Sequence, residues 1–148
     1  MADPLSIAAS VLTVSGVGIT LSSKLYPLVS DLRGAPRQIE DVASDIKLFS
    51  CALKELVGVL DSQQRVHSRN FVDVVGEIVA RCQKTFKEIE EVITEKKGDS
   101  SFFNRLKWFF QKENVKSLRA TLESLRSTLL VMLHLLKFAK KSMELRQE

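Results

Sequence analysis

The segment that decides the fold is the opening of the chain, residues 1–24, which reads MADPLSIAASVLTVSGVGITLSSK. It contains no charged residue between Pro4 and Ser23. At about 1.5 Å rise per residue, a helix of this length would be about 30 Å long, the thickness of the hydrocarbon core of a bilayer. Four interpretations are open: a signal peptide, a transmembrane span, a buried core helix, or a helix that can act as either of the last two.

Two features disfavour the first two interpretations. A signal peptide opens with positive charge and ends in a small-residue cleavage site, whereas this segment opens with Asp3 and has no such site. Two glycines and several hydroxyl residues make the run less hydrophobic than typical spans. The hydroxyl residues are Ser6, Ser10, Thr13, Ser15, Thr20 and Ser22.

Asp3 suits a helix N-cap and Pro4 the first helical position, so a helix is expected to begin there. A helix that is apolar on nearly every side has to be buried in something.

Apolar residues recur at spacings of three and four in three later segments, which predicts three amphipathic helices. They are Ile39, Val42, Ile46, Phe49, Leu53, Leu56 and Leu60; then Phe71, Val75, Ile78, Cys82, Phe86, Ile89 and Ile93; then Val115, Leu118, Leu122, Leu125, Leu129, Met132, Leu136, Ala139 and Met143. No segment shows the sustained alternation that is typical of strands.

The segments between these patterns carry helix-ending residues, among them Gly34, Pro36 and Gly98. A short segment before the last pattern places five apolar side chains on one side. These are Phe102, Phe103, Leu106, Phe109 and Phe110. Within the first helix, Gly16–Gly18 and Pro27 are candidate bends or breaks.

Together these patterns predict an all-α fold, a helical bundle of four long helices plus a short aromatic brace helix lying across it. The first helix is expected at the centre, surrounded by the three striped helices. The chain is expected to form a single domain over residues 1–148. The predicted helices cover about residues 4–32, 36–61, 69–96, 100–110 and 112–146.

The composition indicates an intracellular globular protein. The net charge is +4, but residues 1–74 hold 7 Lys and Arg against 8 Asp and Glu, and residues 75–148 hold 15 against 10. The basic second half is mixed with acids, so a solvated helix surface is one interpretation and attraction to an anionic membrane is another. Nucleic acid is disfavoured because the cations do not cluster along one reading helix. Cys51 and Cys82 have no metal-site spacing and are interpreted as reduced thiols in the core.

No motif with catalytic chemistry is present in the sequence. There is no phosphate-binding loop, and the glycines at 16 and 18 lack the third glycine and the preceding strand of a dinucleotide site. His67 lies in a polar segment, and His134 lies in an apolar run where a partly buried structural role is expected. We therefore predict that the chain is not an enzyme and holds no cofactor and no metal.

Trp108 projects away from the apolar side of its short helix, so it either packs against a neighbouring helix or lies exposed beside Arg105 and Lys107. An exposed tryptophan with flanking cations is typical of a membrane interface. The basic residues that cluster in sequence around it form a candidate lipid-head-group patch. They are Lys96, Lys97, Arg105, Lys107, Lys112 and Lys116.

Three stretches resemble the N-terminal domain of fungal STAND receptors, the NLR-like signalling ATPases. They are MADPLSIAASV at the start, PRQIEDVASDIKLFSCALKELVGVL in the second predicted helix, and RLKWFFQKENVKSLRATLESLRSTLLVML near the end. This family is similar to the HeLo and HeLo-like bundles of fungal heterokaryon incompatibility, and to the four-helix bundle of the mixed-lineage-kinase-like pseudokinase. The resemblance implies an intracellular effector of programmed cell death or innate immunity that is controlled by oligomerisation.

The resemblance also implies that the N-terminal helix inserts into membranes and forms pores. The residues that would take this role are Leu5, Ile7, Val11, Leu12, Val14, Val17, Ile19 and Leu21. The chain would then be cytoplasmic at rest and at the plasma membrane when active, with anionic lipids, its own copies and an NLR-like protein as partners. A non-lytic interaction or oligomerisation module is the alternative. Small residues at four-residue spacing, such as Gly18 and Ser22, would serve close packing in lipid or in the bundle equally well.

Overall fold

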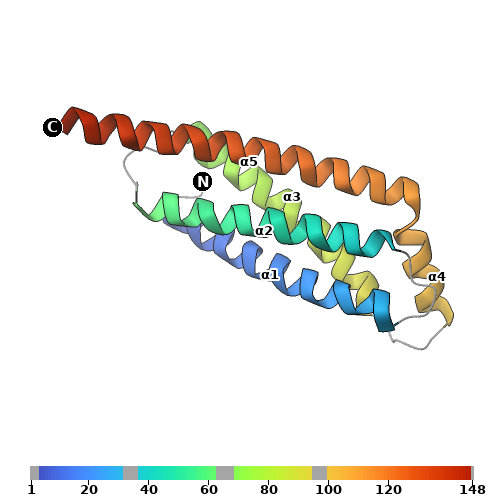
Figure 1. The fold of residues 1–148 in the computed structure, drawn as a ribbon. Helices are drawn as coiled ribbons and strands as arrows, with labels where there is room; N and C mark the ends of the chain where they lie inside the picture. The colour runs from blue at the N-terminus through green and yellow to red at the C-terminus, as the bar shows by residue number, and fades with distance from the viewer. Residues whose placement is uncertain (1–3, 32–36, 63–68, 95–99, 148) are drawn as a thin grey trace.

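The computed structural model describes residues 4–31, 37–62, 69–94 and 100–147. These residues form five α-helices and, within those ranges, no strand (Figure 1). The helices are α1 (Pro4–Asp31), α2 (Gln38–Ser62), α3 (Arg69–Ile93), α4 (Ser100–Phe109) and α5 (Lys112–Gln147). The prediction of an all-α bundle with four long helices and one short helix is confirmed. The largest difference in a boundary is in α3, which ends at Ile93 instead of residue 96.

The central position predicted for the first helix is wrong. α2 packs against both α1 and α5, whereas α1 packs mainly against α2, less against α3, and shares no extensive contact with α5. Figure 1 shows α2 between α1 and α5, with α3 behind them. In a bundle of four long helices each helix faces only some of the others, so no helix is surrounded.

The physical reason for this error lies in the packing of α1, which buries one stripe like the other helices. The buried apolar residues of this stripe are Ile7, Val11, Val14, Leu21, Leu25 and Leu28. Gly18 completes the spacing of four and three between them. Apolar residues between these positions, such as Leu12 and Val17, conceal the stripe in the sequence. The glycines and Pro27 do not end the helix, which is continuous from Pro4 to Asp31.

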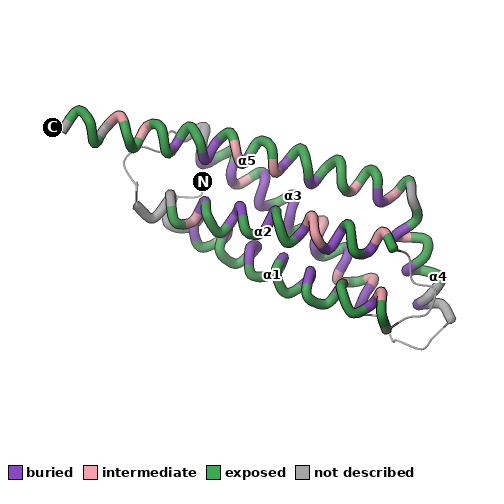
Figure 2. Tube along the Cα trace, viewed as in Figure 1, coloured by how far each residue is buried: buried purple, intermediate pink, exposed green. Residues whose placement is uncertain are grey.

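The core is formed by the predicted stripes of α2, α3 and α5, as Figure 2 shows along the Cα trace. Ile39, Val42, Ile46, Phe49, Leu53 and Leu56 of α2 are all fully buried. The stripes of α3 and α5 are buried from Val75 to Ile93 and, with Leu118 partly buried, from Val115 to Leu136. The side chains of Leu60, Phe71, Phe103 and Met143 lie outside the described residues.

The short helix α4 closes one end of the bundle. It packs against α3 and lies across the direction of the long helices (Figure 1). Phe102 and Leu106 are buried, and so is Phe110, which follows the helix, with its ring centroid 5.1 Å from that of Phe109. The predicted aromatic brace is therefore present at the end of the bundle.

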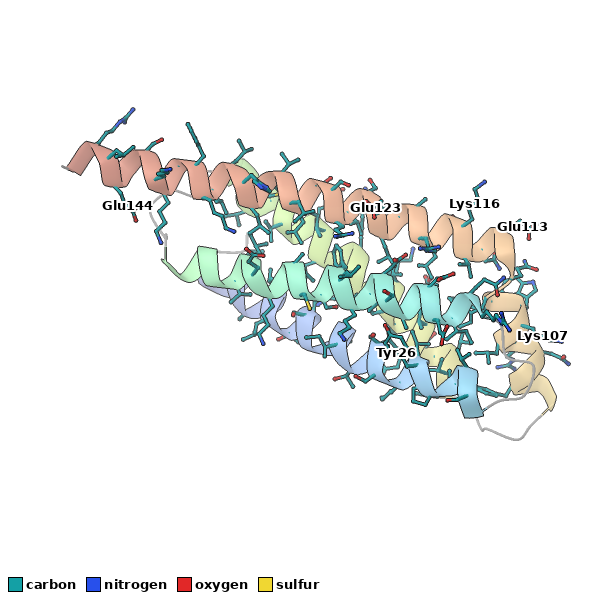
Figure 3. The ribbon with its side chains drawn as sticks, in the orientation of Figure 1. Tyr26, Lys107, Glu113, Lys116, Glu123 and Glu144 are labelled. Carbon is teal, nitrogen blue, oxygen red and sulfur yellow. The ribbon has the colours of Figure 1, made fainter. Side chains whose placement is uncertain are left out.

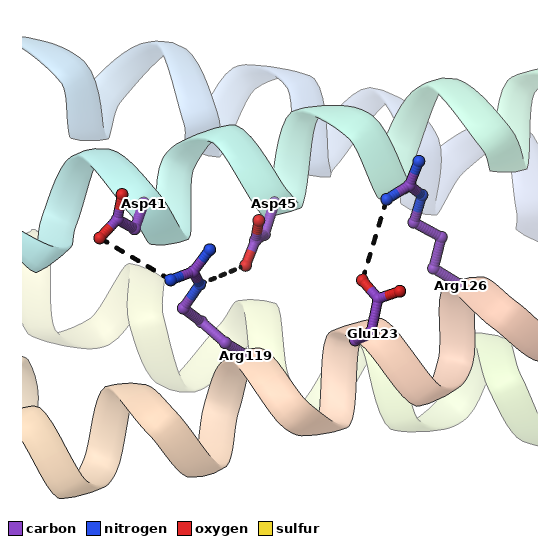
Figure 4. Close-up of polar contacts among 5 residues, drawn as sticks. All are labelled: Asp41, Asp45, Arg119, Glu123 and Arg126. Carbon is purple, nitrogen blue, oxygen red and sulfur yellow. Dashed lines mark hydrogen bonds and ion pairs between the residues drawn. The ribbon is translucent and has the colours of Figure 1, made fainter.

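Ion pairs connect the outer edges of α2 and α5. Arg119 Nε donates a hydrogen bond to Asp45 Oδ2 at 2.7 Å, and Arg119 Nη1 lies 3.8 Å from Asp41 Oδ2 (Figure 4). The pKa of Arg119 is raised, chiefly by the hydrogen bond to Asp45. Further along, Lys137 Nζ donates to Glu55 Oε1 at 2.6 Å. Because most of these side chains are about half exposed, the pairs are expected to add little to stability.

Candidate functional site

The predicted membrane-inserting residues of α1 fall on two different faces. Ile7, Val11, Val14 and Leu21 are buried in the core. Leu12, Val17 and Ile19 are exposed and form what is called here the α1 outer face. The side chain of Leu5 lies outside the described residues. In the folded bundle only part of the predicted set can meet a membrane or a partner.

The contact between α1 and α2 is made through small side chains. Ser15 Oγ donates to the carbonyl oxygen of Ser50, and Ser22 Oγ donates to that of Ala43, both at 2.8 Å and both buried. Gly18 lies between these two serines. A Cβ atom at that position would overlap Ser50 Oγ and lie 2.9 Å from Phe86 Cε2. Gly18 therefore sets how closely the two helices approach.

Ser50 itself is unusual among the described residues, because its hydroxyl oxygen is buried without a hydrogen-bond partner. Burying a hydroxyl group without a partner costs about 1–3 kcal/mol. The oxygen occupies the space above Gly18 that a Cβ atom at residue 18 would need. The seam between α1 and α2 thus combines close packing with an unsatisfied polar group.

The outward side of α1 carries almost no charge. From Ser6 to Ser30 the only charged residue is Lys24, whose Nζ lies 4.0 Å from Glu90 Oε1 of α3. Within the described residues one segment, Ser6–Ser30, is long and apolar enough to cross a membrane. Buried core helices meet the same criterion, and 44% of its most apolar window is buried here. The segment is compatible with a membrane role without demonstrating one.

Trp108 lies exposed at the end of the bundle, with 67% of its surface accessible. It borders an open groove of about 690 Å³ between α3, α4 and α5, whose apolar lining includes Val92, Phe109 and Leu118. Arg105 lines this groove together with Glu88 and Glu91, so the surroundings of Trp108 carry both signs of charge. Asn114 Nδ2 donates to the Trp108 carbonyl oxygen at 3.0 Å, which fixes the junction between α4 and α5.

The predicted basic patch is only partly within the described structure. Arg105, Lys107 and Lys116 are exposed, and Figure 3 shows Lys107 and Lys116 projecting outward near the α4 end of the bundle. Lys96 and Lys97 lie outside the described residues, as does the side chain of Lys112. The three described cations share that end of the molecule with Trp108.

α5 carries a second apolar face, which the sequence patterns above did not predict. Val131, Leu135, Phe138 and Leu145 are 60–71% exposed and are called here the α5 outer stripe. Their spacing of four, three and seven was visible in the sequence. It was concealed because this part of α5 is also apolar on its buried face, with Leu129, Met132, Leu133 and Leu136.

His134 is exposed beside this stripe, so the partly buried position expected for it is wrong. Its Nδ1 lies 2.7 Å from the carbonyl oxygen of Leu130. With Leu130, Val131, Leu135 and Phe138, it lines a shallow hollow on the outside of α5. The residue therefore belongs to a surface and not to the core.

The two cysteines differ in environment. Cys51 is exposed, so the core position predicted for it is wrong, because it lies on the outward side of α2. Cys82 is buried as predicted, and desolvation raises its pKa from 9.0 to about 12. A thiol that remains protonated is a poor nucleophile and metal ligand. The described residues contain no group of three side chains that could hold a metal ion.

These features define an all-helical bundle domain whose distinctive surfaces are apolar helix faces. The chain belongs to the family described as "Pigment biosynthesis cluster protein PigL N-terminal", whose model matches residues 2–147. This family is named for the N-terminal domain of a fungal pigment-cluster protein. No curated protein and no solved structure matches the chain.

Proposed function

We propose that this domain is a membrane-targeting effector of the HeLo-like type, in which α1 inserts into the bilayer after activation. The proposal rests on the length, the low charge and the one-sided packing of α1. It has the length and apolarity of a span, carries one charged residue between Ser6 and Ser30, and packs through one face only. A helix on one side of a bundle can leave it without threading between the others.

At rest, α1 is held by its buried stripe. Burying one Val, Leu or Ile side chain contributes about 1.5–3 kcal/mol, so six such residues contribute roughly 9–18 kcal/mol. An activating event, such as self-association or release from an NLR-like receptor, has to offset this free energy. The folded, isolated domain is therefore expected to be cytoplasmic and inactive.

The exposed cations at the α4 end would then attract the domain to the plasma membrane. Arg105, Lys107 and Lys116 lie at the same end of the bundle as the exposed Trp108, a residue that favours the membrane interface. Each cation near an anionic leaflet contributes about 1 kcal/mol, and salt screens this attraction over roughly 10 Å. Membrane perturbation by this route would lead to cell death or an immune signal.

The test uses a charge placed on the α1 outer face. Val17 is 42% exposed, so Val17→Lys is expected to leave the melting temperature nearly unchanged. Inside a bilayer, however, a lysine near the centre of a span costs about 2.5–3.5 kcal/mol or more. Val17→Lys should therefore strongly reduce dye leakage from vesicles containing anionic lipid, under conditions in which the wild-type domain causes leakage.

The matched control is Leu48→Lys, on an α2 side chain that is 47% exposed. It adds the same charge outside α1 and should leave leakage unchanged. If Val17→Lys and the wild type cause equal leakage, α1 does not insert. If the wild-type domain causes no leakage even after induced self-association, the membrane function is wrong.

A non-lytic interaction module is the second candidate, and the α5 outer stripe favours it. An exposed apolar stripe on a soluble bundle is a typical interaction surface. In this case the domain would bind or oligomerise through α5, and α1 would remain in the core.

A further inference from the structure

We propose that the α5 outer stripe is the docking site for an acidic amphipathic helix of another protein. This inference does not rest on the proposed membrane function, because α1 takes no part in it. It is argued from the spacing of the stripe, the shape of its surface and the charges beside it.

The spacing of the stripe is that of a coiled-coil seam. Val131, Leu135, Phe138, Ser142 and Leu145 follow one another at intervals of four, three, four and three residues. This is the alternation of a and d positions in a heptad repeat. The face points away from the core, because Met132, Leu133 and Leu136 between these positions are buried.

The shape of the surface fits a side chain of a facing helix. Val131, His134, Leu135 and Phe138 stand at positions i, i+3, i+4 and i+7, and all four line the hollow on α5. In helix–helix packing, four residues in this arrangement form the hole that receives one knob of the partner. A helix with Leu or Ile knobs would bury Phe138, which is 71% exposed in the free domain.

The charges beside the stripe select an acidic partner. Among the described residues, the e and g positions beside the exposed stripe are His134, Ala139, Lys141 and Arg146, together with the buried Met132, and none of these is acidic. Glu144 projects to the other side of the helix (Figure 3), and Lys140 at an f position also faces away from the stripe. Opposite charges at e and g positions determine partner choice in coiled coils. A partner with Glu or Asp at its own flanking positions therefore matches this surface.

A second copy of this chain does not match it. Pairing two stripes would bring Lys141 and Arg146 of one copy to the same residues of the other, and no described residue at the flanking positions is acidic. The end of α5 is also accessible to another molecule, because its last turns extend beyond the ends of α1 and α2 (Figure 1).

The experiment measures fluorescence anisotropy of two labelled synthetic peptides, each of three heptads with Leu and Ile at the a and d positions. One has Glu and the other Lys at the e and g positions. The intact domain should bind the Glu peptide at least tenfold more tightly than the Lys peptide at low salt, and the difference should shrink at high salt. Lys141→Glu/Arg146→Glu should reverse this preference.

The stripe is tested by Leu135→Ser/Phe138→Ser, with Leu48→Ser on α2 as the matched control. Because both stripe residues are exposed, the melting temperature should be retained while the affinity for the Glu peptide falls at least tenfold. The control should bind like the wild type. Equal affinity for the two peptides, or unchanged affinity of the stripe variant, overturns the proposal.

Two other occupants are tested with the same variants. Sedimentation velocity of the wild type would show a dimer that is lost in the stripe variant if a second copy covers the stripe. Co-sedimentation with anionic vesicles, lost in the stripe variant while Glu-peptide binding persists, would assign the stripe to lipid. Either result overturns the assignment to an acidic helix.

Discussion

The two helices at the edges of the bundle, α1 and α5, bury an apolar stripe in different ways. α1 buries the small residues Gly18, Ser15 and Ser22 against α2 together with its large stripe residues, and exposes Leu12 and Val17. α5 buries large residues such as Leu129, and its outer stripe is a second set of large apolar residues. In both helices an apolar side chain is therefore a poor guide to burial.

This contrast shows what determines burial in a helix pair. Small residues allow two backbones to approach closely, and hydroxyl groups between them can donate to backbone carbonyls, as Ser15 and Ser22 do. Large residues keep the helices further apart and fill the space between them. The partner surface decides which solution is used, so the same residue type is core in one helix and surface in another.

The largest expected effect concerns α2, the helix that supports both α1 and α5. Ile46→Ala removes a fully buried side chain and should lower the free energy of unfolding by about 2–5 kcal/mol. Leu122→Ala on α5 should have an effect in the same range. Urea denaturation measures both, with the exposed Leu48→Ala expected within about 0.5 kcal/mol of wild type. An Ile46→Ala variant as stable as Leu48→Ala would contradict the described core.

The second largest expected effect tests how closely α1 packs against α2. Gly18→Ala should destabilise the domain by about 1–3 kcal/mol, because the added methyl group meets Ser50 and Phe86. Gly16→Ala is the matched control, since no atom outside the local helix lies within 4 Å of its added Cβ. It should stabilise the domain by up to about 1 kcal/mol through helix propensity. Equal changes in the two melting temperatures would show that α1 does not approach α2 so closely.

A third prediction concerns Cys82 on α3, which packs against both edge helices. Below about pH 9 its thiol is protonated in the folded and the unfolded chain, so it does not affect the pH dependence of stability. Between pH 9 and about 12 the thiol ionises only in the unfolded chain, because burial raises its folded pKa. Stability should therefore fall with rising pH, by up to about 1.4 kcal/mol per pH unit from this group.

This pH dependence is measured by denaturation at pH 8.5 and 10.5, values chosen to be roughly on either side of the ordinary thiol pKa. A Cys51→Ala background removes the exposed thiol, and adding Cys82→Ala should make the decrease smaller. If the decrease is the same with and without Cys82, its thiol is not held protonated by the fold.

The smallest expected effect concerns the ion pairs that align α5 with α2. Arg119→Gln should cost no more than about 1 kcal/mol, because Arg119 and Asp41 are largely exposed and screened by salt. Arg81→Gln, which removes an exposed pair with Glu77 within α3, is the control and should cost about 0.3–0.5 kcal/mol. A loss of several kcal/mol for Arg119→Gln would mean that the pairs, and not the apolar stripe, hold α5 in place.

Much of the fold could be predicted because α2, α3 and α5 carry apolar residues at a clear spacing of three and four. The same periodicity predicted that α5 begins at Lys112 and which side of α4 is buried. α1 was harder, because almost every side of it is apolar and the true stripe from Ile7 to Leu28 differs little from its surroundings. The residues predicted to insert into the membrane therefore include core positions such as Val11 and surface positions such as Val17.

The surfaces were less predictable than the core. The orientation of Trp108 away from the apolar side of α4 followed from helix geometry, but its exposure depended on whether another helix covers it. The α5 outer stripe was missed because one helix can carry two apolar faces, and periodicity alone does not say which face has a partner. His134 was placed wrongly for the same reason.

The sequence by itself determined that this protein is helical, where its long helices begin and end, and which faces of α2, α3 and α5 are apolar. These properties are local, since they depend on backbone propensity and on residues three and four positions apart. Only the tertiary structure decided that α2, and not α1, packs extensively against α5, and that Phe138 is exposed while Ser22 is buried. These properties depend on which helices meet and how closely, and a helix meets its partners through contacts between residues far apart in the chain.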